Sequence, residues 1–149
     1  MCQDWANLLV AVLSILVTIL IGWQIYTAID IKKTIKELKS RTNKQYEDAL
    51  ARAYTSIMNQ TSYVVEGREE DDKCYNAIAN ALFASKHYYL AGKREESERM
   101  LSLICSLKKE HCSFSKKNIN DIRQIIGQVE ERGVKVQRVK DWIDEYEKQ

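Results

Sequence analysis

Cysteine and histidine are the residue types in this chain whose spacing comes closest to a metal or redox site. The 149 residues include four cysteines and two histidines, and Cys105, His111 and Cys112 lie close together in the sequence. Zinc sites usually begin with two ligands that are about two to four residues apart. Six residues separate Cys105 from Cys112, so we predict no metal site, even if Cys74 lies nearby. Cys74 and Cys105 instead fall on apolar helical stripes, where free cysteine behaves as a small hydrophobic residue.

The oxidation state of these cysteines depends on the compartment. In a reducing cytoplasm, no disulfide is expected. In an oxidising compartment, a bridge from Cys105 to Cys112 or from Cys74 to Cys105 would be plausible. The cysteines therefore also provide a check on membrane topology.

Catalytic motifs are absent from the sequence. There is no G-x-x-x-x-G-K-[ST] phosphate loop, no G-x-G-x-x-G, no G-x-S-x-G and no H-E-x-x-H. His87 precedes Tyr88 and is expected at the edge of an apolar helix face. We predict that the protein is not an enzyme and that it uses no cofactor, no metal and no small-molecule substrate.

Tyrosine is abundant, with eight residues in the chain. Most are expected to act as helix-packing rings with a polar tip. Tyr75, Tyr88 and Tyr89 could instead form an exposed cluster that lines a groove for a partner. The sequence leaves both interpretations open.

The first structural element that the sequence predicts is an apolar segment near the N-terminus. From Trp5 to Tyr26 there are 22 residues without a charged side chain. About 20 such residues form a helix that crosses a hydrocarbon layer of ~30 Å. Trp5 at one end, and Trp23 with Tyr26 at the other, occupy the positions that aromatic rings prefer at membrane interfaces. We predict a transmembrane helix over residues 5–27, preceded by a short external N-terminus, residues 1–4.

Polar residues within this segment do not argue against a membrane span. The hydroxyls of Ser14 and Thr18 can bond back to the preceding helical turn. A cleaved signal peptide would need a positively charged start and a small-x-small cleavage site, and neither is present. A buried helix of a soluble protein would need more surrounding core than a small helical domain offers.

The distribution of basic residues predicts the orientation of the segment. No Lys or Arg precedes it, whereas residues 30–44 carry six. Because basic flanks stay in the cytoplasm, we place residues 28–149 there, behind an inner or plasma membrane. We interpret this basic cluster mainly as a topology signal, with lipid recognition as an alternative. It is too short, and too poor in interleaved aromatic residues, to favour nucleic acid. Its members are Lys32, Lys33, Lys36, Lys39, Arg41 and Lys44.

The rest of the chain is predicted to be all-α, because it contains no proline and few glycines. A linker helix is expected over residues 28–66, and it could pair with a second copy as a short coiled coil. Gly67 and the acids that follow it predict a loop. Residues 72–149 then form a small cytoplasmic domain of about two antiparallel helical hairpins, as a bundle or a stack. Gly92 and Gly133 are expected to end helices.

Helical spacing also predicts which side chains face inward. Ser113 or Ser115 is expected to cap the helix that follows them. In the linker, one apolar stripe comprises Tyr46, Leu50, Tyr54 and Ile57. In the domain, the inward positions include Ile78, Leu82, Met100, Leu101, Ile104, Ile119, Ile122, Ile126, Val129, Val139, Trp142 and Ile143.

One hairpin, Asn80 to Leu101, resembles a tetratricopeptide repeat. That repeat places a small residue, a tyrosine, a turn glycine, a second small residue and a large apolar residue at set offsets. Here these are Ser85, Tyr88, Gly92, Ser97 and Leu101. The next glycine of this kind, Gly133, follows Gly92 by 41 residues, whereas tetratricopeptide arrays repeat about every 34. The resemblance implies stacked hairpins whose concave face holds a protein partner.

Two functions follow from this organisation. The first is a single-pass membrane-anchored helical module for protein–protein interaction, an adaptor that captures an unknown protein partner or a second copy of itself. The alternative is a membrane-acting effector, whose cytoplasmic domain senses a signal and oligomerises to disturb the lipid bilayer. Ser14 and Thr18 form only a modest small-residue motif for helix association, and the span contains no ionisable residue.

Overall fold

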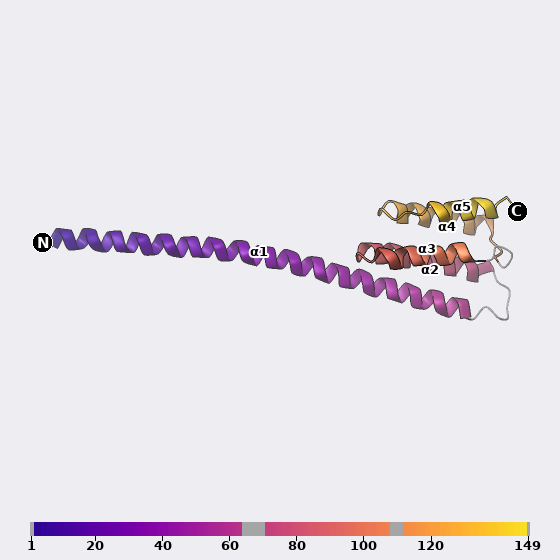
Figure 1. Cartoon of the computed structure of the whole chain (residues 1–149), viewed down its shortest axis with the longest axis horizontal. Helices are drawn as coiled ribbons and strands as arrows, with labels where there is room; N and C mark the ends of the chain where they lie inside the picture. Colours follow the sequence, from indigo (N-terminus) through magenta and orange to yellow (C-terminus); the bar gives the residue numbers. More distant parts are fainter. Residues whose placement is uncertain (1, 64–70, 108–111, 149) are drawn as a thin grey trace. The chain divides into compact units, whose positions relative to one another are not determined.

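The secondary structure is helical throughout the part of the chain that the computed structural model describes, residues 2–63, 71–107 and 112–148 (Figure 1). These residues form five α-helices and no strand, which confirms the predicted all-α class. The helices are α1 (Cys2–Tyr63), α2 (Asp71–Leu90), α3 (Arg94–Ser106), α4 (Lys116–Glu130) and α5 (Gln137–Tyr146). The loop predicted at Gly67 lies outside the described residues.

The chain divides into two compact units, Met1–Thr42 and Asn43–Gln149. The first unit consists of the N-terminal part of α1. The second comprises the last turns of α1 together with the four shorter helices. The division falls within α1, so residues 43–63, which the sequence assigned to the linker, belong to the second unit.

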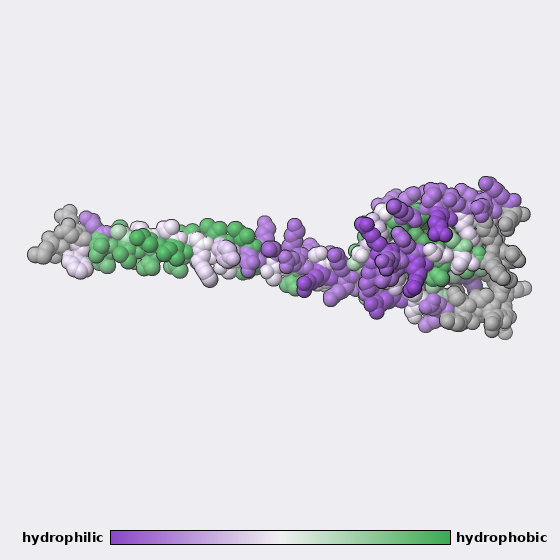
Figure 2. Space-filling view, in the orientation of Figure 1, coloured by the Kyte–Doolittle hydropathy of each residue, from purple (hydrophilic) through white to green (hydrophobic). Residues whose placement is uncertain are grey.

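Apolar side chains of the first unit face outward. Figure 2 shows a hydrophobic surface along the N-terminal part of α1, followed by a hydrophilic stretch. Leu8, Leu13 and Leu20 are each 57–60% exposed. Length and composition make this one helix, among the described residues, able to cross a membrane.

Hydroxyl groups in the first unit behave as the sequence predicts. Ser14 donates to the carbonyl of Val10 and Thr18 to the carbonyl of Ser14, both at 2.8 Å. These bonds within the helix satisfy the hydroxyls, so neither residue needs a partner outside α1.

The second unit has a hydrophobic core to which all of its helices contribute. Helix α2 packs against α3 and α4, and α5 packs against the same two helices. Figure 1 shows α2 beside α3 and α5 beside α4. The inward positions predicted from spacing are buried, and the most fully enclosed large side chains are Ile78, Leu82, Ile104, Ile122, Val129, Val136, Val139 and Ile143.

The glycines predicted to end helices and the predicted helix cap are confirmed by the structure. Gly92 has φ +85° and Gly133 has φ +90°, a left-handed conformation that side chains with a Cβ rarely adopt. Ser115 is the N-cap of α4, and its side chain accepts a hydrogen bond from the backbone N–H of Asn118 at 3.1 Å. The turns between helices are therefore determined locally.

The face that α1 buries in the second unit overlaps the predicted stripe only in part, because Tyr54 packs against the core whereas two other members of the stripe are exposed. Tyr46 is 62% exposed and Ile57 is 47% exposed. The buried positions are instead Ala51 and Met58. Apolar spacing gave Ala51 no weight, yet its small side chain allows a close approach between helices, so the buried face includes Ala51 and Met58 beside Tyr54.

Candidate functional site

A hollow in the second unit lies between α3 and the start of α5. Its volume is about 370 Å³. Leu101 and Val139, both core residues, form its apolar part, and polar side chains surround them. We call it the α3–α5 groove. Its lining comprises Glu98, Leu101, Ser102, Cys105, Lys135, Gln137, Arg138 and Val139.

Two smaller hollows extend the α3–α5 groove along the same helices. One, of about 140 Å³, shares Glu98, Leu101 and Lys135 with it and reaches Tyr89. The other, of about 240 Å³, shares Cys105 and Arg138 and reaches Trp142 at its far end. The result is an elongated depression with an aromatic residue at each end, a shape suited to an extended or helical segment.

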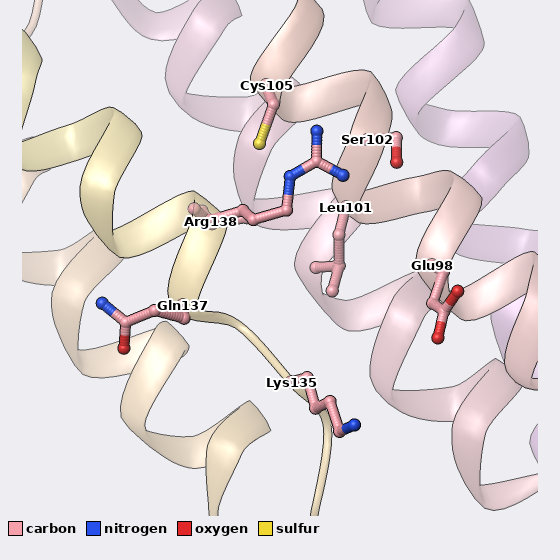
Figure 3. Close-up of a pocket in the computed structure, with 8 residues that line it drawn as sticks. Glu98, Leu101, Ser102, Cys105, Lys135, Gln137 and Arg138 are labelled. Carbon is pink, nitrogen blue, oxygen red and sulfur yellow. The ribbon is translucent and has the colours of Figure 1, made fainter.

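Charge in the α3–α5 groove is mixed. Figure 3 shows the Arg138 guanidinium extending from α5 toward α3, between Cys105 and Ser102. Glu98 lies further along α3, and Lys135 comes from the turn before α5. A surface with both signs of charge fits a polypeptide better than it fits a polyanion such as nucleic acid.

Cys105 is not set up as a nucleophile in this groove. Burial raises the pKa of its thiol, Arg138 opposes that effect, and Asp141 adds to it. The net result is a thiol that stays protonated near neutral pH, whereas a reactive cysteine is a thiolate.

The three tyrosines proposed as a partner groove are distributed over different surroundings. Tyr89 lines the smaller hollow next to the α3–α5 groove, and its ring lies 5.8 Å from the Arg94 guanidinium. Tyr88 faces α1, where its hydroxyl lies 3.5 Å from the Thr55 hydroxyl. Tyr75 is half-buried against the core. Of the three, only Tyr89 lines a hollow named above.

A polar seam joins the last turns of α1 to α2 and the α2–α3 turn within the second unit. His87 donates from Nδ1 to Glu47 Oε2 at 2.5 Å, and its ring stacks on that of Tyr54. Lys93 Nζ lies 2.8 Å from Asp48 Oδ1. Sequence reasoning placed His87 at the edge of an apolar face but did not find these partners, because their pairing joins positions about forty residues apart.

The carboxylate of Asp48 is the electrostatic centre of this seam. Arg52 Nη2 lies 3.1 Å from its Oδ2, and Lys93 approaches the other oxygen. The hydrogen bond from Lys93 is the largest influence that lowers the pKa of Asp48, and Arg52 acts in the same direction. Burial opposes both. Asp48 is therefore held as an anion, in a structural role.

The three cysteines of the second unit lie in two different surroundings. Cys112 is buried with Cys74 as a neighbour, whereas Cys105 lies in the α3–α5 groove. His111 lies outside the described residues. Within residues 2–63, 71–107 and 112–148, no three His, Cys, Asp or Glu side chains come together as metal ligands.

The predicted membrane-interface residues are all on the exposed surface of α1. Trp5, Trp23 and Tyr26 are each about 70% exposed, at 68%, 70% and 69%. The six residues of the basic cluster are exposed as well, on the part of α1 that follows the apolar run. None of these side chains packs into the hydrophobic core.

Comparison with known proteins identifies no relative of this chain. The chain matches no protein-family model, no curated protein and no solved structure.

Proposed function

We propose that this chain is a single-pass membrane protein that holds a small α-helical protein–protein interaction module at the cytoplasmic face. The observation that supports it best is the continuity of α1. This one helix bears an outward-facing apolar run long enough for a bilayer, and later contributes Ala51 and Met58 to a folded core.

The membrane is the solvent that the exposed apolar surface of α1 requires. Large apolar side chains left in water along a whole helix would be an aggregation hazard, whereas lipid solvates them. In this proposal Trp5 lies at the outer interface and Trp23 and Tyr26 at the inner one. The basic cluster then meets the anionic cytoplasmic leaflet, where each cation contributes about 1 kcal/mol before salt screening.

The α3–α5 groove is the surface that we assign to the partner. It combines a partly apolar floor with unlike charges at its rim, and the half-buried Tyr89 at one end is typical of an interface anchor. The four shorter helices would act as two antiparallel hairpins that present this groove, the arrangement that the tetratricopeptide resemblance implies. Anchoring raises the local concentration of the module at the membrane, so a modest affinity suffices for capture.

Site-specific photocrosslinking in native membranes tests this proposal. A photoreactive residue replaces Ser102, which lines the α3–α5 groove, or Gln128, an exposed position on α4 outside the hollows named above. We expect a distinct second protein attached at position 102, identified by mass spectrometry, and none at position 128. Equal labelling at both positions, or no labelling at either, would contradict the assignment of the α3–α5 groove as the partner-binding site.

The same experiment separates the adaptor from the membrane-acting effector. Crosslinks only between copies of this chain, in one defined oligomer, would favour the effector. A dye-leakage assay with vesicles is then decisive, because an adaptor leaves vesicles sealed. Orientation is tested by an epitope tag after Gln149, which must become accessible only after the cells are permeabilised.

A further inference from the structure

Cys74 and Cys112 are distant in sequence but adjacent in the second unit. Cys74 lies in the first turns of α2, and Cys112 lies just before the Ser115 cap of α4. Since α2 and α4 pack together, the fold brings the two thiols next to each other in the same core cluster. Cys112 belongs to the buried core cluster, and Cys74 is half-buried against it.

The backbone around Cys112 is held in place by an aromatic residue of α5. The Tyr146 hydroxyl donates to the carbonyl of Cys112 at 3.0 Å and accepts from the N–H of Phe114 at 3.1 Å. The rings of Tyr146 and Phe114 also meet edge to face, with centroids 4.8 Å apart. These contacts fix the segment, so the thiol of Cys112 stays beside Cys74.

The two thiols differ in a way that assigns them different roles. Cys112 is 7% exposed. Burial raises the pKa of its thiol well above the ordinary range, and the neighbouring Cys74 raises it further. Cys74 is the more exposed of the two, so a dissolved oxidant reaches its sulfur first.

We propose that Cys74 and Cys112 are a redox modification site, at which a peroxide converts the dithiol into a reversible intramolecular disulfide. The Cys74 sulfur loses its proton and attacks one peroxide oxygen; the O–O bond breaks, a sulfenic acid forms, and the departing oxygen takes up that proton as water or alcohol. Cys112, losing its proton, attacks the Cys74 sulfur and expels hydroxide, which becomes water. Two thiols lose two electrons in total and the peroxide gains them.

The bridge would tie the first turns of α2 to the entry of α4. It closes a long stretch of chain, residues 74–112, and so restricts the unfolded state more than the folded one. Reduction by a small thiol such as glutathione restores the original pair, because the same exchange chemistry runs in reverse. Oxidation therefore stabilises the second unit without adding a ligand.

Peptide mapping of the full-length protein in detergent tests the site directly. Trypsin cleaves after lysine and arginine, so each of the three cysteines of the second unit falls in its own peptide. These peptides are residues 74–86, 100–108 and 110–116. After treatment with hydrogen peroxide and blocking of free thiols, we expect peptide 74–86 linked to peptide 110–116, with the link removed by dithiothreitol.

Single-cysteine variants make the test specific. Cys105→Ser is the matched control and retains the linked peptide at the wild-type yield. Cys74→Ser and Cys112→Ser both lose it, and circular dichroism checks that they remain helical. The oxidised wild type is expected to melt roughly 5 °C or more above its reduced form, a shift absent from both variants.

Two results would overturn the proposal. One is a link that involves peptide 100–108 in place of the predicted pair. The other is peroxide treatment that leaves both thiols open to alkylation, or drives Cys74 to sulfinic acid with Cys112 unchanged. Because the assay identifies the bonded sulfurs, it does not depend on the partner assigned to the α3–α5 groove.

Discussion

The two units of this protein treat the same kinds of side chain in opposite ways. In the first unit, the leucines and isoleucines of the apolar run are about half exposed or more, for example Leu16 at 51% and Ile19 at 61%. In the second, Ile78 and Leu82 are fully enclosed. The apolar side chains of the second unit are removed from water by one another, whereas the first unit by itself leaves its apolar side chains uncovered.

The hydrogen-bond partners of serine hydroxyls also differ between the two units. In the first unit, Ser14 bonds to a carbonyl of its own helix. In the second unit, Ser85 and Ser97 are both buried and share a hydrogen bond of 2.9 Å between α2 and α3. A hydroxyl between packed helices can take a distant partner, whereas the hydroxyl of Ser14 bonds within its own helix.

The largest effect is expected from charge placed in the exposed apolar run. The double change Leu13→Arg with Leu16→Arg should prevent membrane integration, because each arginine costs about 2.5–3.5 kcal/mol at the centre of a span. The matched control, Ile35→Arg with Leu38→Arg, changes equally exposed residues of the same helix outside the predicted span. Extraction of membranes with alkaline carbonate measures the difference. If both doubles remain integrated, the apolar run is not the anchor.

Two leucine-to-alanine variants, one in each unit, are expected to differ in their effect on the stability of the second unit. Leu82→Ala should lower the free energy of unfolding of the second unit by about 2–5 kcal/mol, because it leaves a cavity. Leu16→Ala should leave that free energy unchanged, since Leu16 is exposed in the first unit. Thermal unfolding in detergent, followed by circular dichroism, measures both. Equal losses would mean that the apolar run is part of a shared core.

Removing a hydroxyl sharpens the comparison at a smaller scale. Ser85→Ala leaves the buried hydroxyl of Ser97 without its partner and should cost about 1–3 kcal/mol. The double variant Ser85→Ala with Ser97→Ala should cost less than the single change, because it leaves no unpaired group. Ser14→Ala should have no effect on unfolding of the second unit. A double variant less stable than Ser85→Ala would show that the serines matter by packing alone.

The smallest effect is electrostatic and depends on pH. The pKa of Asp48 is lower in the folded state than its ordinary value of about 3.9. Its ion pairs therefore stabilise the fold fully above that ordinary value, and this contribution is lost as the pH falls through the lower folded-state pKa. Asp48→Asn should cost about 0.2–1 kcal/mol at pH 7, and the difference from wild type should vanish in strong acid.

Urea unfolding at several pH values measures this contribution. Glu37→Gln, an exposed carboxylate of the first unit, is the control and should leave the second unit unchanged. A difference between Asp48→Asn and wild type that persists unchanged into strong acid would show that the ion pairs with Lys93 and Arg52 are not its source.

Local features were predictable because they depend on neighbours in sequence. The left-handed glycines at 92 and 133, the Ser115 cap and the inward faces of the four shorter helices all follow from spacing and residue type. The faces that depend on a distant partner were not predictable. In α1, Ala51 is buried and Tyr46 is exposed, although Tyr54 of the same predicted stripe packs against the core. Tyr88 and Tyr89 lie in different surroundings although they are adjacent in the chain.

The residues of the candidate site were also predictable only in part. Sequence reasoning named Tyr89 but none of the charged residues of the α3–α5 groove, because Glu98 and Arg138 have the pattern of ordinary solvated helix faces. Nor did it pair Cys74 with Cys112, since spacing along the chain says nothing about which turns of α2 and α4 come together.

By itself, the sequence determined the helices, many of their ends, and the position of the apolar run that is long enough to cross a membrane. These depend on local backbone preferences and on periodicity over a few turns. Only the tertiary structure decided which helix faces meet, which thiols touch, and where a groove opens between α3 and α5. Those outcomes depend on packing between segments tens of residues apart, where the fit of particular side chains selects one arrangement from several with the same apolar pattern.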